Sequence, residues 1–150
     1  MFSNMIKYTA GKGRKACFAT TRKSLSLGRL TVKIAVQLFD SYVLPVLNYG
    51  SEIWCKNKPM AVIETVQLKF LKFILGVKNS TCSDAIYGEL GRFPLYLSQI
   101  VKLIKYWSRI IKLDKDKLVY KAYCTLIELD DYGFMNWVSS IRELLSLYNL

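Results

Sequence analysis

Apolar residues recur every three or four positions along most of this chain, which is the spacing of helices with one buried face. Gly11 and Gly13 are expected to interrupt the first segment, residues 5–27, near its beginning, and residues 12–26 fit a first helix with a basic face. Gly28 suits a helix end, because glycine accepts the left-handed conformation found there. Thr31 is then a good N-cap for a second helix.

The second helix is expected to bury one apolar face, made of Ile34, Ala35, Leu38, Phe39 and Tyr42. Pro45 lies inside this pattern, lacks a backbone N–H and biases Leu44 away from helical angles, so it predicts a kink or a break. The apolar spacing then resumes as far as Trp54, and Gly50 beside Tyr49 indicates close helix packing.

Residues 61–77 predict a helix that is apolar on most sides, as expected of a helix in the centre of a bundle. One face carries Ile63, Val66, Phe70, Phe73 and Val77. The polar stripe is limited to Thr65, Lys69 and Lys72. Pro59 suits the first turn of this helix.

Four further helices follow, and no strand-period run competes with them. A short helix over 84–90 should end at Gly91, and Pro94 should open the next one. Residues 118–129 and 137–150 complete the pattern, with a turn at 130–133 between them. The sequence therefore predicts an all-α bundle of about seven helices, in two subdomains that meet near residues 77–83.

Positive charge is concentrated at the beginning of the chain. Eight of the first 34 residues are basic and none is acidic, in a chain whose formal net charge is +11. Such a segment is typical of a surface for a polyanion, with a flexible, solvated basic terminus as the alternative. The candidate phosphate contacts are Lys12, Arg14, Lys15, Arg22 and Lys23.

A second row of basic residues, Lys102, Lys105, Arg109 and Lys112, repeats at helical spacing. Charge on one helix face is usually the solvated face, but a row without acidic neighbours also suits phosphate contacts, and both interpretations stay open. The three tryptophans and ten tyrosines are interpreted mainly as core residues, with base stacking as the alternative.

Several kinds of chemistry find no support. The chain has no histidine, so triads based on serine or cysteine lack their usual base. Cys17, Cys55, Cys82 and Cys124 are too far apart for a zinc site, and they are expected to be semi-buried thiols in a reducing compartment. The run Gly11–Lys15 lacks the spacing of a phosphate-binding loop.

Asp130 and Asp131 are the only two acidic residues that are adjacent in the sequence. They invite comparison with the paired aspartates of polymerases. Glu128 occupies the position of the expected aromatic residue, and no strand follows the pair. We interpret the pair as a solvated turn, and we expect no metal, cofactor or small-molecule substrate in this chain.

The longest uncharged run, Ser41–Ser51, is much shorter than the roughly 20 apolar residues of a membrane-spanning helix. The first residues also lack the pattern of a secretory signal. We therefore expect an intracellular protein, nuclear or cytoplasmic, without a membrane partner.

Several blocks of the chain resemble the region that follows the polymerase core of non-LTR (LINE-type) retrotransposon reverse transcriptases. They are Lys12–Ala19, Leu38–Trp54, Ile63–Val77, Ser80–Thr81, Tyr87–Leu95 and Lys105–Trp107. The order and spacing of these blocks carry the resemblance, which extends from about Lys12 to the C-terminus.

The resemblance implies a helical thumb over residues 1–78 and a helical connector over 79–150 that is incomplete at its C-terminus. In that family the thumb grips the primer–template duplex, here an RNA–DNA hybrid or another duplex, through its backbone. The catalytic aspartates and their magnesium belong to the palm, which with the fingers would precede Met1 in a parent polyprotein. The chain is thus expected to be a non-catalytic fragment of an RNA-directed DNA polymerase.

Two other interpretations remain. The chain could be an orphan structural fragment, whose exposed apolar faces once packed on the rest of the polymerase and which now self-associates. An independent enzyme has little support, and metal-dependent activity that depends on Asp130 would be needed to establish it.

Overall fold

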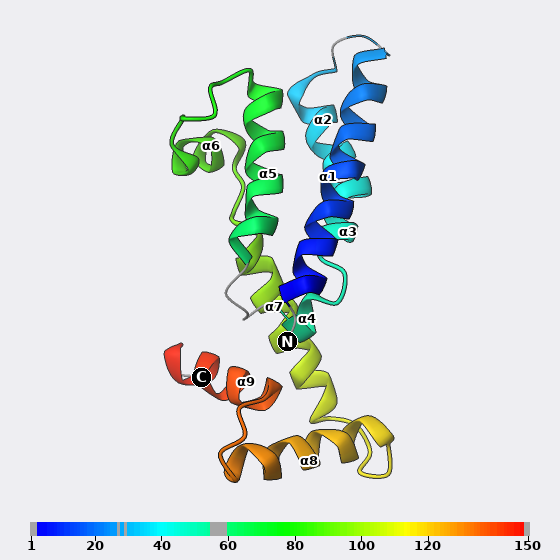
Figure 1. The fold of residues 1–150 in the computed structure, drawn as a ribbon, viewed down its shortest axis with the longest axis vertical. Helices are drawn as coiled ribbons and strands as arrows, with labels where there is room; N and C mark the ends of the chain where they lie inside the picture. Colours follow the sequence, from blue (N-terminus) through cyan, green and yellow to red (C-terminus); the bar gives the residue numbers. More distant parts are fainter. Residues whose placement is uncertain (1–2, 27, 29, 55–59, 149–150) are drawn as a thin grey trace. The chain divides into compact units, whose positions relative to one another are not determined.

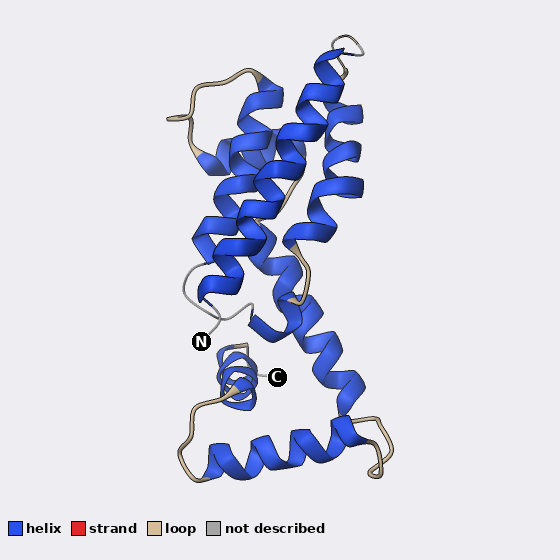
Figure 2. Ribbon diagram, turned by 45° about the vertical axis from the view of Figure 1, so that its right-hand side comes forward, coloured by secondary structure: helices blue, strands red, loops and turns tan. Residues whose placement is uncertain are grey.

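A computed structural model describes residues 3–26, 28, 30–54 and 60–148, and within these ranges every regular element is a helix (Figure 2). In chain order the elements are α1 (Ser3–Ser26), α2 (Val32–Leu38), the π-helix η1 (Phe39–Val43), α3 (Leu44–Leu47), α4 (Ser51–Trp54), α5 (Met60–Leu75), α6 (Ser83–Leu90), α7 (Leu95–Ile110), α8 (Leu118–Asp131) and α9 (Trp137–Leu147). The predicted all-α fold is confirmed. Pro59 and Cys55, which the sequence analysis used, lie outside the described residues.

The helices form two compact units, Met1–Gln99 and Ile100–Leu150. This boundary does not coincide with the border at residues 78 and 79 between the thumb and the connector, an assignment that stays a prediction. The difference arises because α5 holds the segment that follows it. The Gln67 Nε2 donates to the Phe93 carbonyl at 3.2 Å, and a Glu64 carboxylate oxygen accepts from the Leu95 N–H at 2.8 Å.

In the first unit, α1 lies beside α5 and α3, and α6 lies against the other side of α5 (Figure 1). Ile6 and Ala10 of α1 are fully buried in this core. The Phe39 and Phe70 rings stack with their centroids 4.7 Å apart, which joins η1 to α5. The buried core of the first unit extends along the chain from Ile6 of α1 to Leu95 at the start of α7.

The first helix is longer than predicted, because it begins at Ser3 and includes Gly11 and Gly13. The expected interruption is wrong. A Cβ added at Gly13 would overlap the side chain of Leu47, so this glycine lets α1 and α3 approach closely. Close packing compensates for the roughly 1 kcal/mol by which glycine weakens a helix.

The regular geometry of the second predicted helix is interrupted as expected, by the π-helix η1, which ends two residues before Pro45. The expected bias of Leu44 away from helical angles is wrong, because Leu44 has a φ of −58° and a ψ of −40° and α3 continues through Pro45. Thr31 is the N-cap, and its hydroxyl accepts from the Ile34 N–H at 3.4 Å. Ala35 and Phe39 are buried as predicted, but Ile34 and Tyr42 are exposed. The wide π turn keeps residues four apart on one face, so the buried stripe continues through Val43 and Leu47 instead.

The central helix α5 buries Ile63, Val66 and Phe70 as predicted, whereas Phe73 and Val77 are exposed. Lys72 was expected on the polar stripe and is buried instead, with its Nζ donating to the Asn79 carbonyl at 2.7 Å. The helix ends at Leu75, and Gly76 turns the chain with a φ of 67°. That turn brings residue 79 back to the ammonium group.

The helix boundaries that follow agree with the glycine and proline signals. Gly91 has a φ of 59° and caps α6, as predicted. α7 begins at Leu95, directly after Pro94.

In the second unit, aromatic side chains join three helices. The Trp107 Nε1 donates to the Tyr123 hydroxyl at 3.0 Å. The Trp137 ring makes edge-type contacts with the rings of Tyr106 and Tyr123, with ring centroids 5.8 and 6.4 Å apart. The predicted inner face of α9, Val138, Ile141 and Leu144, is buried. Tyr148, which was expected on this face, is exposed.

Candidate nucleic-acid interface on α1

All five basic residues predicted as phosphate contacts in the first segment are exposed on α1: Lys12, Arg14, Lys15, Arg22 and Lys23. Because α1 is one continuous helix, the helical geometry fixes the spacing of these side chains along its axis. Lys15 and Arg22 are seven residues apart and therefore lie on the same side of the helix. Lys12 and Lys23 are separated by about 16 Å along the axis, at 1.5 Å per residue.

This face carries an excess of positive charge. α1 contains no acidic residue. In the described part of the chain, the side-chain ion pairs join Arg92 to Asp40 and Arg142 to Asp130 and Asp131, and none of them involves Lys12, Arg14, Lys15 or Arg22. An exposed row of cations on a helix that contains no carboxylate attracts a polyanion.

The opposite face of α1 is apolar and supports the row. Cys17 is half-buried there, and burial raises the pKa of its thiol to about 12. The thiol is therefore neutral near pH 7 and adds no negative charge to the helix. The Thr20 hydroxyl donates to the Ala16 carbonyl at 2.9 Å, so it does not point into the basic face as a competing acceptor.

A groove of about 380 Å³ lies at the first half of α1, lined by Tyr8, Thr9, Lys12, Pro45, Val46 and Tyr49. Its walls are mostly apolar and come from α1 and from α3 with the turn after it. The Lys12 Nζ lies 5.3 Å from the centre of the Tyr8 ring, a cation–π contact. Tyr8 and Tyr49 are 65% and 74% exposed, so both rings offer a face to solvent.

The second predicted row, Lys102, Lys105 and Arg109, is also exposed, in the part of α7 that belongs to the second unit. Lys112 is exposed as well and follows the end of α7. These residues form a second row, which lies on a different helix from the row on α1.

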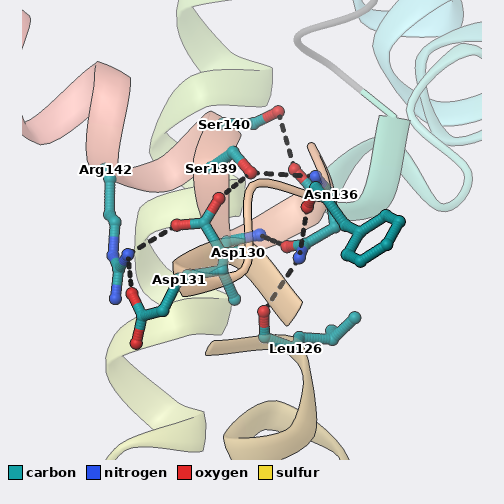
Figure 3. Close-up of polar contacts among 9 residues, drawn as sticks. Leu126, Asp130, Asp131, Asn136, Ser139, Ser140 and Arg142 are labelled. Atoms are coloured by element: carbon teal, nitrogen blue, oxygen red, sulfur yellow. Dashed lines mark hydrogen bonds and ion pairs between the residues drawn. The ribbon is translucent and has the colours of Figure 1, made fainter. Parts of the chain in front are cut away.

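Asp130 and Asp131 are in the last turn of α8 and not in a loop, so the predicted solvated turn is corrected (Figure 3). Their carboxylates both accept from the Arg142 Nη1, at 2.6 and 2.8 Å, and Asp130 also accepts from the Ser139 hydroxyl. The strongest cause of the raised pKa of Arg142 is its hydrogen bond to Asp131. This pair fixes α9 to the end of α8.

The interpretation of the tryptophans and tyrosines as mainly core residues holds for the tryptophans, which are buried or half-buried, but not for six of the ten tyrosines. Tyr8, Tyr42, Tyr49, Tyr96, Tyr132 and Tyr148 are exposed. The groove was also missed by the sequence analysis. Tyr8 and Lys12 are four residues apart and signal one wall, but no local pattern shows that Pro45 and Tyr49 form the other wall.

Comparison of the chain with known protein families, with curated proteins and with solved structures finds no match. Among the described residues no helix combines the length and the apolar character needed to cross a bilayer, and no group of three or more side chains is arranged to hold a metal ion.

Proposed function

We propose that this chain holds a nucleic-acid duplex through backbone contacts, as the thumb and connector of an RNA-directed DNA polymerase of the non-LTR retrotransposon type. The observation that carries the proposal is the exposed face of α1, which presents five basic side chains on a helix without an acidic residue. On this proposal polymerisation and its magnesium belong to the palm of the parent polymerase, and this chain contributes the grip.

The chemistry of the face suits phosphates more than bases. Lysine and arginine on an exposed helix contact phosphate oxygens, which fixes the register of a duplex but carries no sequence information. α1 has 24 residues and is about 36 Å long, which is close to one turn of a duplex. Binding should therefore be independent of sequence and should weaken steeply with salt.

The test is titration of the whole chain against a short fluorescent RNA–DNA hybrid, followed by anisotropy between about 50 and 200 mM salt. The variant replaces Lys12, Arg14, Lys15 and Arg22 with glutamine. It should lose most of the binding and should lower the salt slope by about 3 to 4, since each phosphate contact contributes about 0.9.

A matched control replaces Lys78, Lys115, Lys117 and Lys121 with glutamine, because these four lysines are exposed and lie outside α1 and α7. The control has the same net charge as the variant, so a local interface predicts a much smaller effect. Equal losses in both variants, or no binding by the folded unchanged chain at low salt, would refute the proposal.

The α7 row needs a variant of its own, with Lys102, Lys105 and Arg109 replaced by glutamine. If the duplex also contacts the second unit, the salt slope falls by about 2 to 3. An unchanged slope would restrict the interface to α1.

A second candidate function is a contact with another protein segment, a copy of this chain included. The segment between α8 and α9 exposes Tyr132, Phe134 and Met135 to 82%, 65% and 90%. Consecutive exposed apolar side chains favour association. Sedimentation that shows a monomer at all concentrations would count against this candidate.

A further inference from the structure

We propose that the groove between α1 and α3 binds one unpaired nucleobase of a strand whose phosphates contact the basic face of α1. The inference deepens the proposed function, because it assigns a separate base-stacking site beside the phosphate contacts. It rests on Tyr8 and Tyr49, which the backbone grip does not require, and on Lys12, which belongs both to the grip and to the lining of the groove.

The shape and the walls of the groove suit a flat ring. Its volume of about 380 Å³ is at the lower end of the range for sites that take small organic groups. Pro45 and Val46 supply apolar surface. Thr9 also lines the groove and is only 5% exposed. A base that entered this groove would remove apolar surface from water on both of its faces.

The exposed tyrosines supply the stacking surface. In the described part of the chain the ring pairs join Phe39 to Phe70 and aromatic residues of the second unit, and none of them includes Tyr8 or Tyr49. The Lys12 ammonium already lies over one face of the Tyr8 ring, so the other face of Tyr8 and the exposed Tyr49 ring are available to a ligand. Every base has a π-face, so stacking on tyrosine tolerates any sequence, which agrees with contacts made through the backbone.

The charge at the groove selects a nucleotide over an uncharged aromatic ligand. Lys12 lines the groove, and Lys15 is exposed one turn further along α1. No acidic residue lines the groove. A base in the groove would therefore have its own phosphate within the field of these two cations, in line with the phosphate row that continues to Arg22.

The glycine of α1 explains why the groove has this geometry. Gly13, the residue after Lys12, allows Leu47 to pack directly against the backbone of α1. α3 is thereby held close to α1, and the short wall of Pro45 and Val46 stands opposite Tyr8. The Trp54 Nε1 donates to the Tyr49 carbonyl at 3.0 Å, which fixes the backbone of the other tyrosine.

The experiment compares two short single strands of equal charge, one of deoxyadenosines and one of abasic sugar phosphates. Electrostatic attraction is the same for both, so the difference in affinity reports stacking of bases. We expect the unchanged chain to bind the adenine strand about tenfold more tightly, the effect of one base on one aromatic ring. Tyr8→Ala and Tyr49→Ala should each reduce this ratio, and the double variant should remove it.

Tyr42→Ala is the matched control, because Tyr42 is 65% exposed on η1 and lies outside the groove. The ratio should not change in this variant. All three tyrosines are exposed, and circular dichroism will show that the variants fold. Equal binding of both strands by the unchanged chain, or a ratio that survives in the double variant, would overturn the inference.

The same variants separate this inference from the proposed function. Blunt RNA–DNA hybrid has no unpaired base, so Tyr8→Ala and Tyr49→Ala should leave its binding unchanged, while the four-residue charge variant should abolish it. Failure of the blunt hybrid to bind would refute the grip and leave the strand comparison valid by itself. If the tyrosine variants changed only the self-association of the chain, the occupant would be a second copy, and the assignment to a nucleobase would be wrong.

Discussion

Gly13 of α1 lies directly against the side chain of Leu47 of α3, with no room for a Cβ between the helix backbone and the leucine Cδ2. Gly11, one half-turn earlier in the same helix, has open space around the position of its missing Cβ. Two glycines in one helix therefore have opposite roles, and the helix tolerates both.

The pair gives a prediction of opposite sign. Gly11→Ala should raise the free energy of unfolding by about 0.5–1 kcal/mol, because alanine is the better helix former. Gly13→Ala should lower it by about 1–3 kcal/mol, because the methyl group overpacks the contact with Leu47. Urea denaturation followed by circular dichroism measures both, and a similar effect of the two substitutions would show that α1 and α3 are not in contact.

The junction of α8 and α9 predicts a hierarchy of two polar residues. Asn136 caps α9 with its Oδ1 accepting from the Val138 N–H at 2.8 Å, and its Nδ2 donates to the Leu126 carbonyl at 2.8 Å. Asn136→Ala should cost about 1–2 kcal/mol of stability. Arg142→Gln should cost less stability than Asn136→Ala, because that guanidinium is solvent-exposed.

Salt separates the two effects at this junction. Screening should remove most of the loss caused by Arg142→Gln and leave the loss caused by Asn136→Ala unchanged. Urea denaturation at low and at high salt is the measurement. A larger loss of stability for Arg142→Gln than for Asn136→Ala at both salt concentrations would contradict the prediction that the Asn136 cap contributes most to the junction.

Cys17 predicts a loss of stability at alkaline pH. Burial raises the pKa of its thiol from 9.0 to about 12 in the folded chain. Between these values the unfolded chain loses a proton that the folded chain keeps, so the stabilising contribution is complete below pH 9 and is lost as the pH rises towards 12. Cys17→Ala should flatten this part of the stability curve.

The control for the cysteine is Tyr87→Phe. Burial and the hydrogen bond to Glu64 raise the pKa of the Tyr87 hydroxyl above its usual value of 10.0, so its contribution is lost at higher pH than the onset for Cys17. Urea midpoints measured at several pH values between 8 and 11, about the range of the two unfolded groups, distinguish them. An alkaline decline that is identical in the unchanged chain and in Cys17→Ala would mean that the thiol is not buried.

Glu64 predicts non-additive substitutions. Its carboxylate accepts from the Tyr87 hydroxyl of α6 and from the Leu95 N–H of α7. Glu64→Ala leaves both donors unpaired and should cost about 2–4 kcal/mol, whereas Tyr87→Phe should cost about 1 kcal/mol. The double variant should lose less stability than the sum of the losses of the two single variants. Strict additivity would show that the two side chains do not interact.

Much of the fold could be predicted because it depends on local chemistry. The Thr31 cap, the glycine at position 91 and the inner face of α9 follow from residue types at fixed offsets, and all three are confirmed. The interruption at Pro45 is of the same kind. These features need no knowledge of which helices meet.

The features that could not be predicted depend on contacts between distant residues. Lys72 is buried because Asn79 returns to it after the turn at Gly76, and Ile34 is exposed because the buried stripe continues through Val43 and Leu47. Gly13 was expected to interrupt a helix. Its contact with Leu47 could not be foreseen, because the two residues are distant in the sequence. The basic row on α1 was visible in the sequence, but the aromatic groove beside it required α3 to be in place.

The π-helix η1 contains one residue more than a regular helical turn would need, so the chain after it is rotated relative to a straight helix. Loss of a single residue within Phe39–Val43 would restore regular geometry and turn α3 by about 100°. Leu47 would leave Gly13, and Pro45 would leave the groove, although every side chain of the groove would still be present. Insertions and deletions in this segment are therefore a more sensitive record of whether a related chain keeps the groove than the identity of the groove residues themselves.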